Sequence, residues 1–99
     1  MEKKISPYKP DFEKEIEDKE DISIGLEVRV VLYNDEWHSF DEVIEQIIKA
    51  VNCSFEEART MTFEVHVKGK AIVFSGDMSK CLKVSSILEE IALHTQIIS

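Results

Sequence analysis

The sequence predicts one small α+β domain, in which a three-stranded antiparallel sheet packs against three helices behind a flexible N-terminal tail. Two observations support this fold class. A β-branched run of strand length follows a polar leader, and three later stretches repeat apolar residues at helical spacing, two of them behind a capping motif. Short apolar segments supply two more strands, which gives the order β-α-α-β-α-β of helices layered on a sheet. A chain of 99 residues buries only a small core, so its working surface must be shallow.

The first strand and the first helix carry clear local signals. The run EVRVVLY at 27–33 has strand length and ends at the turn-forming pair Asn34 and Asp35. Ser39 and Glu42 then have the spacing of a capping box. We therefore expect a helix over about 40–51, with an apolar face made of Phe40, Val43, Ile44, Ile47, Ile48 and Val51.

A second capping box, formed by Ser54 and Glu57, opens the second predicted helix. Gly69 is its expected terminator, because glycine readily adopts the left-handed conformation that ends many helices. His66 falls in its last turn. The inward stripe is predicted to consist of Ala58, Met61, Thr62 and Val65.

The C-terminal part continues with a short strand at 71–74 (AIVF) and a turn at Gly76 and Asp77. Thr95–Ile98 can supply the last strand. The helix between them is predicted to carry an apolar stripe of Met78, Cys81, Leu82, Ser85, Leu88, Ile91 and Ala92.

Residues 1–24 differ in composition from the remainder, which forms the predicted domain 25–99. They hold both prolines, and the stretch Asp11–Asp21 has seven acidic residues against two lysines. Such a segment buries too little apolar surface to offset its ordering entropy, so we expect a mobile leader. Its role is open between simple solubilisation and docking through a short helix marked by Phe12 and Ile16.

The net charge of −8 argues against nucleic acid as a partner, because affinity for phosphates needs clustered lysine and arginine. A cationic partner suits this charge better. The chain has no apolar run long enough to span a membrane and no signal-peptide core at its N-terminus, so we expect a cytoplasmic protein with no membrane partner. Cys53 and Cys81 belong to no CxxC pair and occupy apolar packing positions, although one disulfide between them stays open.

The residues able to do chemistry lie in two places, the turn 34–38 (NDEWH) and His66. Taken alone, Asn-Asp after a strand is a turn signal, and a histidine at a helix C-terminus interacts favourably with the helix dipole. If the fold brings them together, however, they offer amide, carboxylate and imidazole acceptors. Beside an apolar pocket, such a cluster suits a free α-ammonium group whose side chain is buried next door.

Two catalytic alternatives use some of the same residues. Asp35, His38 and His66 contain the ligand types of a metal site, but their spacing lacks a tight histidine pair. Cys53 with His66 would be a nucleophile and base, with a thiol pKa lowered by the adjacent helix N-terminus, but no third orienting group is evident. The sequence also lacks GxGxxG, Walker A and GxSxG motifs. We therefore expect neither an enzyme nor a bound metal or cofactor.

The segment VRVVLYNDEWHSFDEVIEQIIKAVNCSFEEARTMTFEVHVKGKAIVF at 28–74 resembles the ClpS family, and the resemblance continues to about Ile97. Its strongest elements are VVLYND followed by a helix, and EVHVKGKA about thirty residues later. Members are bacterial adaptors that deliver N-end-rule substrates to a ClpA-type unfoldase. The resemblance implies a non-enzymatic α+β domain behind a flexible leader. It would bind proteins that begin with Leu, Phe, Tyr or Trp and dock on the N-domain of a ClpA- or ClpC-type unfoldase.

The resemblance also implies roles for individual residues. The α-amino group would be bound by Asn34, Asp35, Glu36 and His66. The pocket for the first side chain would be lined by Leu32, His38, Phe40, Val43, Thr62 and Val65, with Ile97 as its back wall. Lys83 aligns with a basic position that docks the chaperone.

Four of these positions depart from the family pattern. Phe40 stands where Met is common, Glu36 where Asp is usual, His38 where a small hydroxyl residue is often found, and Thr62 where a bulky residue, often Met, occurs. A generic protein-interaction domain of the same fold with a different ligand is therefore the alternative function. Binding of peptides with and without a free amine separates the two.

Overall fold

The predicted elements are all present in the structure, a computed structural model that describes residues 26–99. The proposed leader at 1–24 lies outside the described residues. Within them, the chain forms β1 (Val28–Tyr33), α1 (Phe40–Val51), α2 (Phe55–Lys68), β2 (Lys70–Gly76), α3 (Met78–Leu88), a 3₁₀ turn (Glu89–Ile91) and β3 (Thr95–Ile98). This confirms the α+β class and the β-α-α-β-α-β order.

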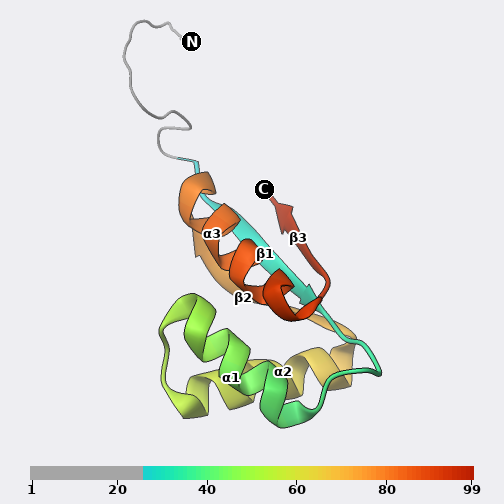
Figure 1. Cartoon of the computed structure of the whole chain (residues 1–99). Helices are drawn as coiled ribbons and strands as arrows, with labels where there is room; N and C mark the ends of the chain where they lie inside the picture. The colour runs from blue at the N-terminus through green and yellow to red at the C-terminus, as the bar shows by residue number, and fades with distance from the viewer. Residues whose placement is uncertain (1–25) are drawn as a thin grey trace, which may run out of the picture.

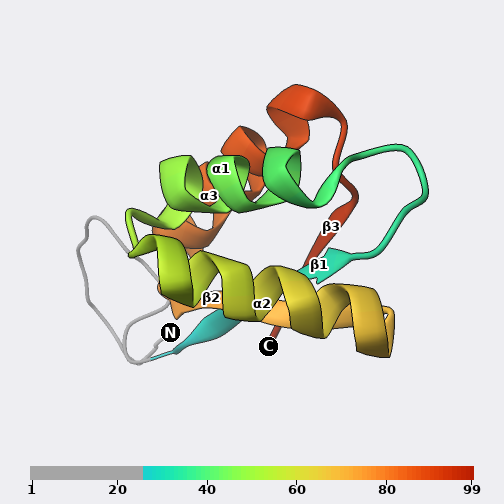
Figure 2. The ribbon, with the colours of Figure 1, turned by 90° about the horizontal axis from the view of Figure 1, so that it is seen from below.

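The sheet is antiparallel, with β1 between β2 and β3. Figure 1 shows α3 lying along the sheet, with α1 and α2 stacked beyond one end of it. Seen from below, α1 and α2 run side by side, and the segment between β1 and α1 loops out beside them (Figure 2). The end of β1 therefore meets α1 and α2 at one corner of the domain.

Local capping fixes the ends of the two stacked helices, as the sequence predicts. Ser39 and Ser54 each accept a hydrogen bond from the backbone N–H three residues on, and the Glu at that position bonds back to the serine N–H. Helix α2 ends at Gly69, whose φ of 87° is in the left-handed region. Each box satisfies two helix N–H groups that would otherwise lack a partner.

The core lies between the helices and one face of the sheet. Fully buried side chains from the central strand meet those from all three helices: Val30, Leu32, Ile47, Ala58, Cys81 and Leu88. Apolar burial of this kind, at about 25 cal/mol per Å², is the main stabilising contribution to a domain of this size. The predicted inward residues of α2 are all buried or half-buried.

The predicted stripe of the third helix is partly wrong. Leu82 is 56% exposed, whereas Val84, which the stripe omitted, is only 4% exposed. The helix also ends at Leu88, and the chain turns through the 3₁₀ segment to Ala92, whose φ is 65°. Cys81, Val84 and Leu88 form the inward row, with alternating steps of three and four residues, so Leu82 falls about 100° away from Cys81 around the helix.

Both cysteines are free thiols, so the disulfide that the sequence left open is not formed. Cys81 is buried, and its Sγ lies 3.5 Å from the carbonyl oxygen of Val28. Burial raises its pKa above the ordinary value for a thiol. None of the helices in the part of the chain that the structure describes is both long and apolar enough to cross a membrane.

Candidate functional site

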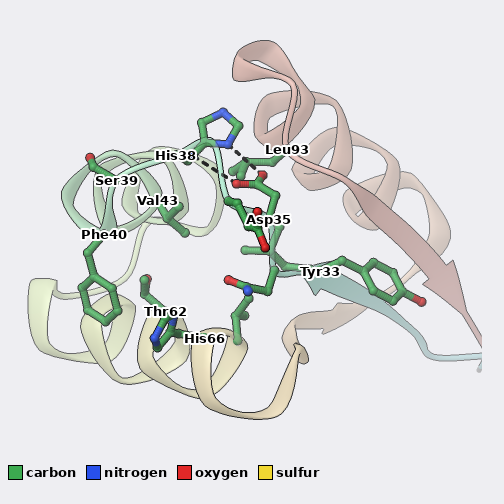
Figure 3. A pocket seen from close by; sticks show the side chains of 13 residues that line it. Tyr33, Asp35, His38, Ser39, Phe40, Val43, Thr62, His66 and Leu93 are labelled. Carbon is green, nitrogen blue, oxygen red and sulfur yellow. Dashed lines mark hydrogen bonds and ion pairs between the residues drawn. The ribbon is translucent and has the colours of Figure 1, made fainter.

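A cavity of about 400 Å³ opens at the corner where β1 ends between α1 and α2 (Figure 3). The end of β1 and the following turn line one part of it, the first turns of α1 another, and the second half of α2 a third. The lining residues are Leu32, Tyr33, Asn34, Asp35, Glu36, His38, Ser39, Phe40, Val43, Thr62, Val65, His66 and Leu93.

The fold brings together every residue predicted for the amine-binding group and, apart from the expected back wall Ile97, for the apolar pocket, because these residues all line this cavity. Lys83 does not line the cavity, since it lies on the exposed surface of α3. The expected back wall is also different. Ile97 pairs with Val30 inside the sheet, and Leu93, in the link before β3, lines the cavity instead.

Tyr33, Ser39 and Leu93 are lining residues that the sequence reasoning missed. Tyr33 is the last residue of the predicted strand and Ser39 was assigned to helix capping, so both positions carried a signal for a different role. Leu93 is a buried apolar residue between the third helix and the last strand. Its isolation from any periodic stretch hid it from a pattern analysis.

One backbone hydrogen bond sets the polar end of the cavity. The N–H of Asn34 donates to the carbonyl oxygen of Gly69 at 2.9 Å, and Gly69 caps α2 three residues after His66. The turn after β1 is thereby attached to the C-terminal end of α2. Asn34 and His66 are both exposed at the cavity, where their side chains can reach a ligand.

The carboxylate of Asp35 organises the turn in which it sits. Its Oδ1 accepts from the backbone N–H groups of Trp37 at 2.9 Å and His38 at 3.0 Å, and its Oδ2 lies 2.8 Å from Nδ1 of the His38 ring. Burial disfavours the charged carboxylate, but these hydrogen bonds and the charge of His38 outweigh it and lower the pKa of Asp35. Asp35 is thus an ionised group whose two oxygens already have partners within the turn.

His38 is the clearest difference from the expected pocket. It lines the cavity, but its ring nitrogens are engaged by polar groups rather than forming an apolar wall (Figure 3). Nδ1 faces Asp35, and Nε2 lies 2.5 Å from the carbonyl oxygen of Ile91. The hydrogen bond with Asp35 raises the pKa of His38, opposed by burial and reinforced by the Ile91 carbonyl and by the charges of Asp35 and Glu42.

The apolar part of the cavity lies between two helices. Phe40 on α1 meets His66 on α2 edge to face, with ring centroids 6.2 Å apart (Figure 3). Thr62 is buried at 4% exposure, and its hydroxyl donates to the carbonyl oxygen of Ala58 at 2.8 Å. The threonine hydroxyl is therefore satisfied inside its own helix and needs no partner from a ligand. Leu32, Val43, Val65 and Leu93 complete the apolar lining.

The catalytic alternatives do not fit this geometry. Among residues 26–99, no three His, Cys, Asp or Glu side chains are grouped closely enough to hold a metal ion, so Asp35, His38 and His66 do not form a metal centre. Cys53 precedes α2 and His66 lies in its last turn, about 20 Å along the helix. Burial and the nearby Glu57 also raise the pKa of Cys53, contrary to the lowering that its position suggested.

Cys53 borders a second, more open hollow, lined by Val51, Cys53, Ser54, Glu56, Glu57, Thr60, Met61, Val73 and Phe74.

A sequence model of one protein family matches residues 26–96, which is most of the chain and all of the cavity lining. Its description is ATP-dependent Clp protease adaptor protein ClpS. Two similar proteins carry the same name. The ClpS of Treponema denticola is 38% identical over 60 residues, which cover 57% of this chain and 59% of that protein. The ClpS of Wolinella succinogenes is 29% identical over 79 residues, covering 78% and 76%.

A similar segment also occurs within a much larger protein. The chain is 33% identical over 76 residues to the E3 ubiquitin-protein ligase UBR1 of Drosophila melanogaster, and it spans only 4% of that protein's length. Among solved structures, ClpS2 of Agrobacterium tumefaciens bound to L-phenylalaninamide aligns with a TM-score of 0.68 at 16% identity. The alignment covers 72% of this chain and 93% of that one, which shows a shared fold.

Proposed function

Since the chain belongs to the ClpS family of ATP-dependent Clp protease adaptor proteins, we propose that it is a non-enzymatic, cytoplasmic adaptor for N-degron proteins. It binds the free α-amino group and the large hydrophobic first side chain of a substrate that begins with Leu, Phe, Tyr or Trp. It then delivers that substrate to a ClpA- or ClpC-type unfoldase for degradation.

The observation that carries the proposal is the placement of polar acceptors and an apolar wall on one cavity. An α-ammonium group has three N–H donors and one positive charge, and it needs acceptors that converge on a point. The Asn34 amide oxygen and a ring nitrogen of His66 supply two such acceptors, and Glu36 adds negative charge at the same turn. Asp35 contributes mainly through the turn that it holds, because its oxygens accept from Trp37 and His38.

The apolar part of the cavity suits the first side chain. Its walls come from aliphatic residues and from Phe40, and burying a Leu or Phe side chain there contributes about 1.5–3 kcal/mol. L-phenylalaninamide, the compound bound to the Agrobacterium ClpS2 of similar fold, combines a free amine with such a side chain. That combination supports the proposed ligand class without assigning contacts in this chain.

Delivery uses surfaces away from the cavity. Lys83 lies exposed on α3, whereas the cavity lies between α1, α2 and the end of β1. We assign Lys83 to chaperone docking and the leader at 1–24 to engagement by the unfoldase. Binding of the substrate and binding of the chaperone are then compatible at the same time.

The proposal is tested by comparing peptides that begin with free and with acetylated Phe. The acetyl group removes the positive charge and two of the three donors while it leaves the side chain unchanged. We expect binding of the free peptide and a loss of about a hundredfold or more on acetylation. Equal affinity for both peptides would instead indicate a generic protein-interaction domain with the ClpS fold.

A further inference from the structure

The ring of His38 joins two segments that both line the cavity. One is the turn after β1, which carries Asn34, Asp35 and Glu36, and the other is the link that ends in Leu93. Nδ1 of the ring lies 2.8 Å from Asp35 Oδ2, and Nε2 lies 2.5 Å from the carbonyl oxygen of Ile91, two residues before Leu93. Figure 3 shows the ring between Asp35 and the Leu93 segment.

Both partners of the ring are acceptors, which makes its protonation state decisive. A neutral imidazole has one N–H and donates to only one of them, whereas an imidazolium donates to both. The side chains of His38 and Asp35 are only 12% and 18% exposed, so solvent gives the unmatched acceptor little compensation. The bridge is therefore complete only when the ring carries a proton on each nitrogen.

Two charged groups lie around the ring of His38: Asp35 from the turn after β1 and Glu42 from α1. The link after α3 contributes the carbonyl of Ile91. Its acidic residues have other partners, since Glu90 accepts from Lys49 at 2.9 Å and Glu89 accepts from Thr95 at 2.9 Å. Together with the hydrogen bonds, these charges raise the pKa of His38 and lower that of Asp35. The ion pair therefore persists between the two titrations.

We propose that His38 is a positioning residue for the amine-binding turn, a role that rests on the proposed function: its protonated ring holds Asp35, and with it Asn34 and Glu36, against the segment that supplies Leu93. It acts through Asp35 rather than by bonding the ligand. Because the pKa is raised in the folded chain, the bridge is fully formed below the ordinary histidine value of 6.5 and is lost as the pH rises through the folded value.

Three substitutions distinguish the hydrogen bond from the His38 ring to Asp35 from the one to the carbonyl of Ile91. His38→Asn places an amide nitrogen near the position of Nδ1 and retains a donor for Asp35. His38→Gln places one near Nε2 and retains a donor for Ile91, and His38→Ala removes both. The matched control is His94→Gln, which removes a different histidine, exposed beside Tyr33. Affinity for a peptide beginning with Phe is measured from pH 6 to pH 8.5, with the melting temperature of each variant at each pH.

At pH 6 we expect His38→Ala to bind about tenfold more weakly than the unaltered protein, with His38→Asn and His38→Gln between them. The ratio of the affinity of the unaltered protein to that of His38→Ala should fall below about threefold at pH 8.5, because a neutral ring keeps only one of the two hydrogen bonds. Deprotonation of the ligand amine weakens both proteins equally and cancels in the ratio. His94→Gln should show the affinity and pH dependence of the unaltered protein.

Different outcomes refute different claims. If the ratio of the affinities of the unaltered protein and His38→Ala is constant from pH 6 to pH 8.5, or is near one throughout, the role of His38 is overturned while the proposed function stands. A loss of affinity at pH 6 that is matched by unfolding of all three variants would make His38 structural. Absence of Phe-peptide binding to the unaltered protein would overturn the proposed function itself, and with it the binding role of the bridge.

Discussion

The backbone N–H of Asn34 bonds the carbonyl oxygen of Gly69 at 2.9 Å and attaches the end of β1 to the end of α2. Residues that are 32 positions apart in the chain, Asn34 and His66, therefore open on the same cavity. Two local signals make this contact available, the turn after the strand and the left-handed glycine that ends the helix. The placement of Asn34 and His66 on one cavity, and with it the geometry of the proposed amine-binding site, is thus a direct consequence of how two elements end.

Replacing either acceptor should weaken binding without affecting folding. Asn34→Ala or His66→Ala leaves one donor of a charged amine unpaired, at a cost of about 1.5–3 kcal/mol, or roughly 10- to 100-fold in affinity. Both side chains are exposed, so melting temperatures should stay close to that of the unaltered protein. Lys83→Ala is the matched control, and its peptide affinity should be unchanged. Melting temperatures that fall in proportion to affinity would assign Asn34 and His66 to structure.

Much of the fold follows from local sequence signals. The capping boxes at Ser39 and Ser54 mark the starts of α1 and α2 where the structure has them, and Gly69 marks the end of α2. The exposed Leu82 and the buried Val84 show the limit of such signals, because α3 has apolar residues on more than one side. Contacts with the sheet, rather than spacing along the helix, decide which side faces inward.

The site was predictable in its membership but not in its internal contacts. The residues expected to bind the amine and the first side chain line one cavity, and their binding roles stay predictions. The contact between the His38 ring and the Ile91 carbonyl joins residues 53 positions apart, and Ile91 is followed by Ala92 in the left-handed conformation. No periodic pattern records such a contact. For the same reason Leu93, rather than Ile97, was found at the cavity wall.

Thr62 should control access of β-branched side chains. Thr62 on α2 and Phe40 on α1 both line the cavity, and the Thr62 hydroxyl donates to the carbonyl oxygen of Ala58 within α2 (Figure 3). Thr62→Met adds bulk beside the ligand Cβ, where Ile and Val are widest. It should lower the ratio of Ile-peptide to Phe-peptide affinity by roughly fivefold, about 1 kcal/mol.

The matched control for Thr62→Met is Thr62→Val, which keeps the shape and removes only the internally bonded hydroxyl. Its Ile-to-Phe ratio should equal that of the unaltered protein. If Thr62→Met leaves the ratio unchanged, the position does not gate the cavity. Phe40 is then the remaining large side chain able to restrict it.

Deleting residues 1–24 should separate binding from delivery. The cavity lies entirely within residues 32–93, so affinity for a Phe-peptide should be unaffected. Degradation of a Phe-initiated protein by the chaperone and its protease should slow, because the unfoldase loses the segment that we expect it to engage. Lys83→Glu provides a comparison that alters docking while it retains the leader. Equal degradation rates with and without residues 1–24 would leave the leader only a solubilising role.

The central claim is that one cavity reads a free amine together with an apolar side chain, and L-phenylalaninamide tests it most directly. Titrating this compound into the isotope-labelled full chain, with N-acetyl-phenylalaninamide as the control, identifies the binding residues by their NMR shifts. We predict saturable shifts at Asn34, Thr62, His66 and Leu93 with the free amine, and none with the acetylated compound. Equal responses to both compounds, or shifts confined to the hollow beside Cys53 and Phe74, would contradict it.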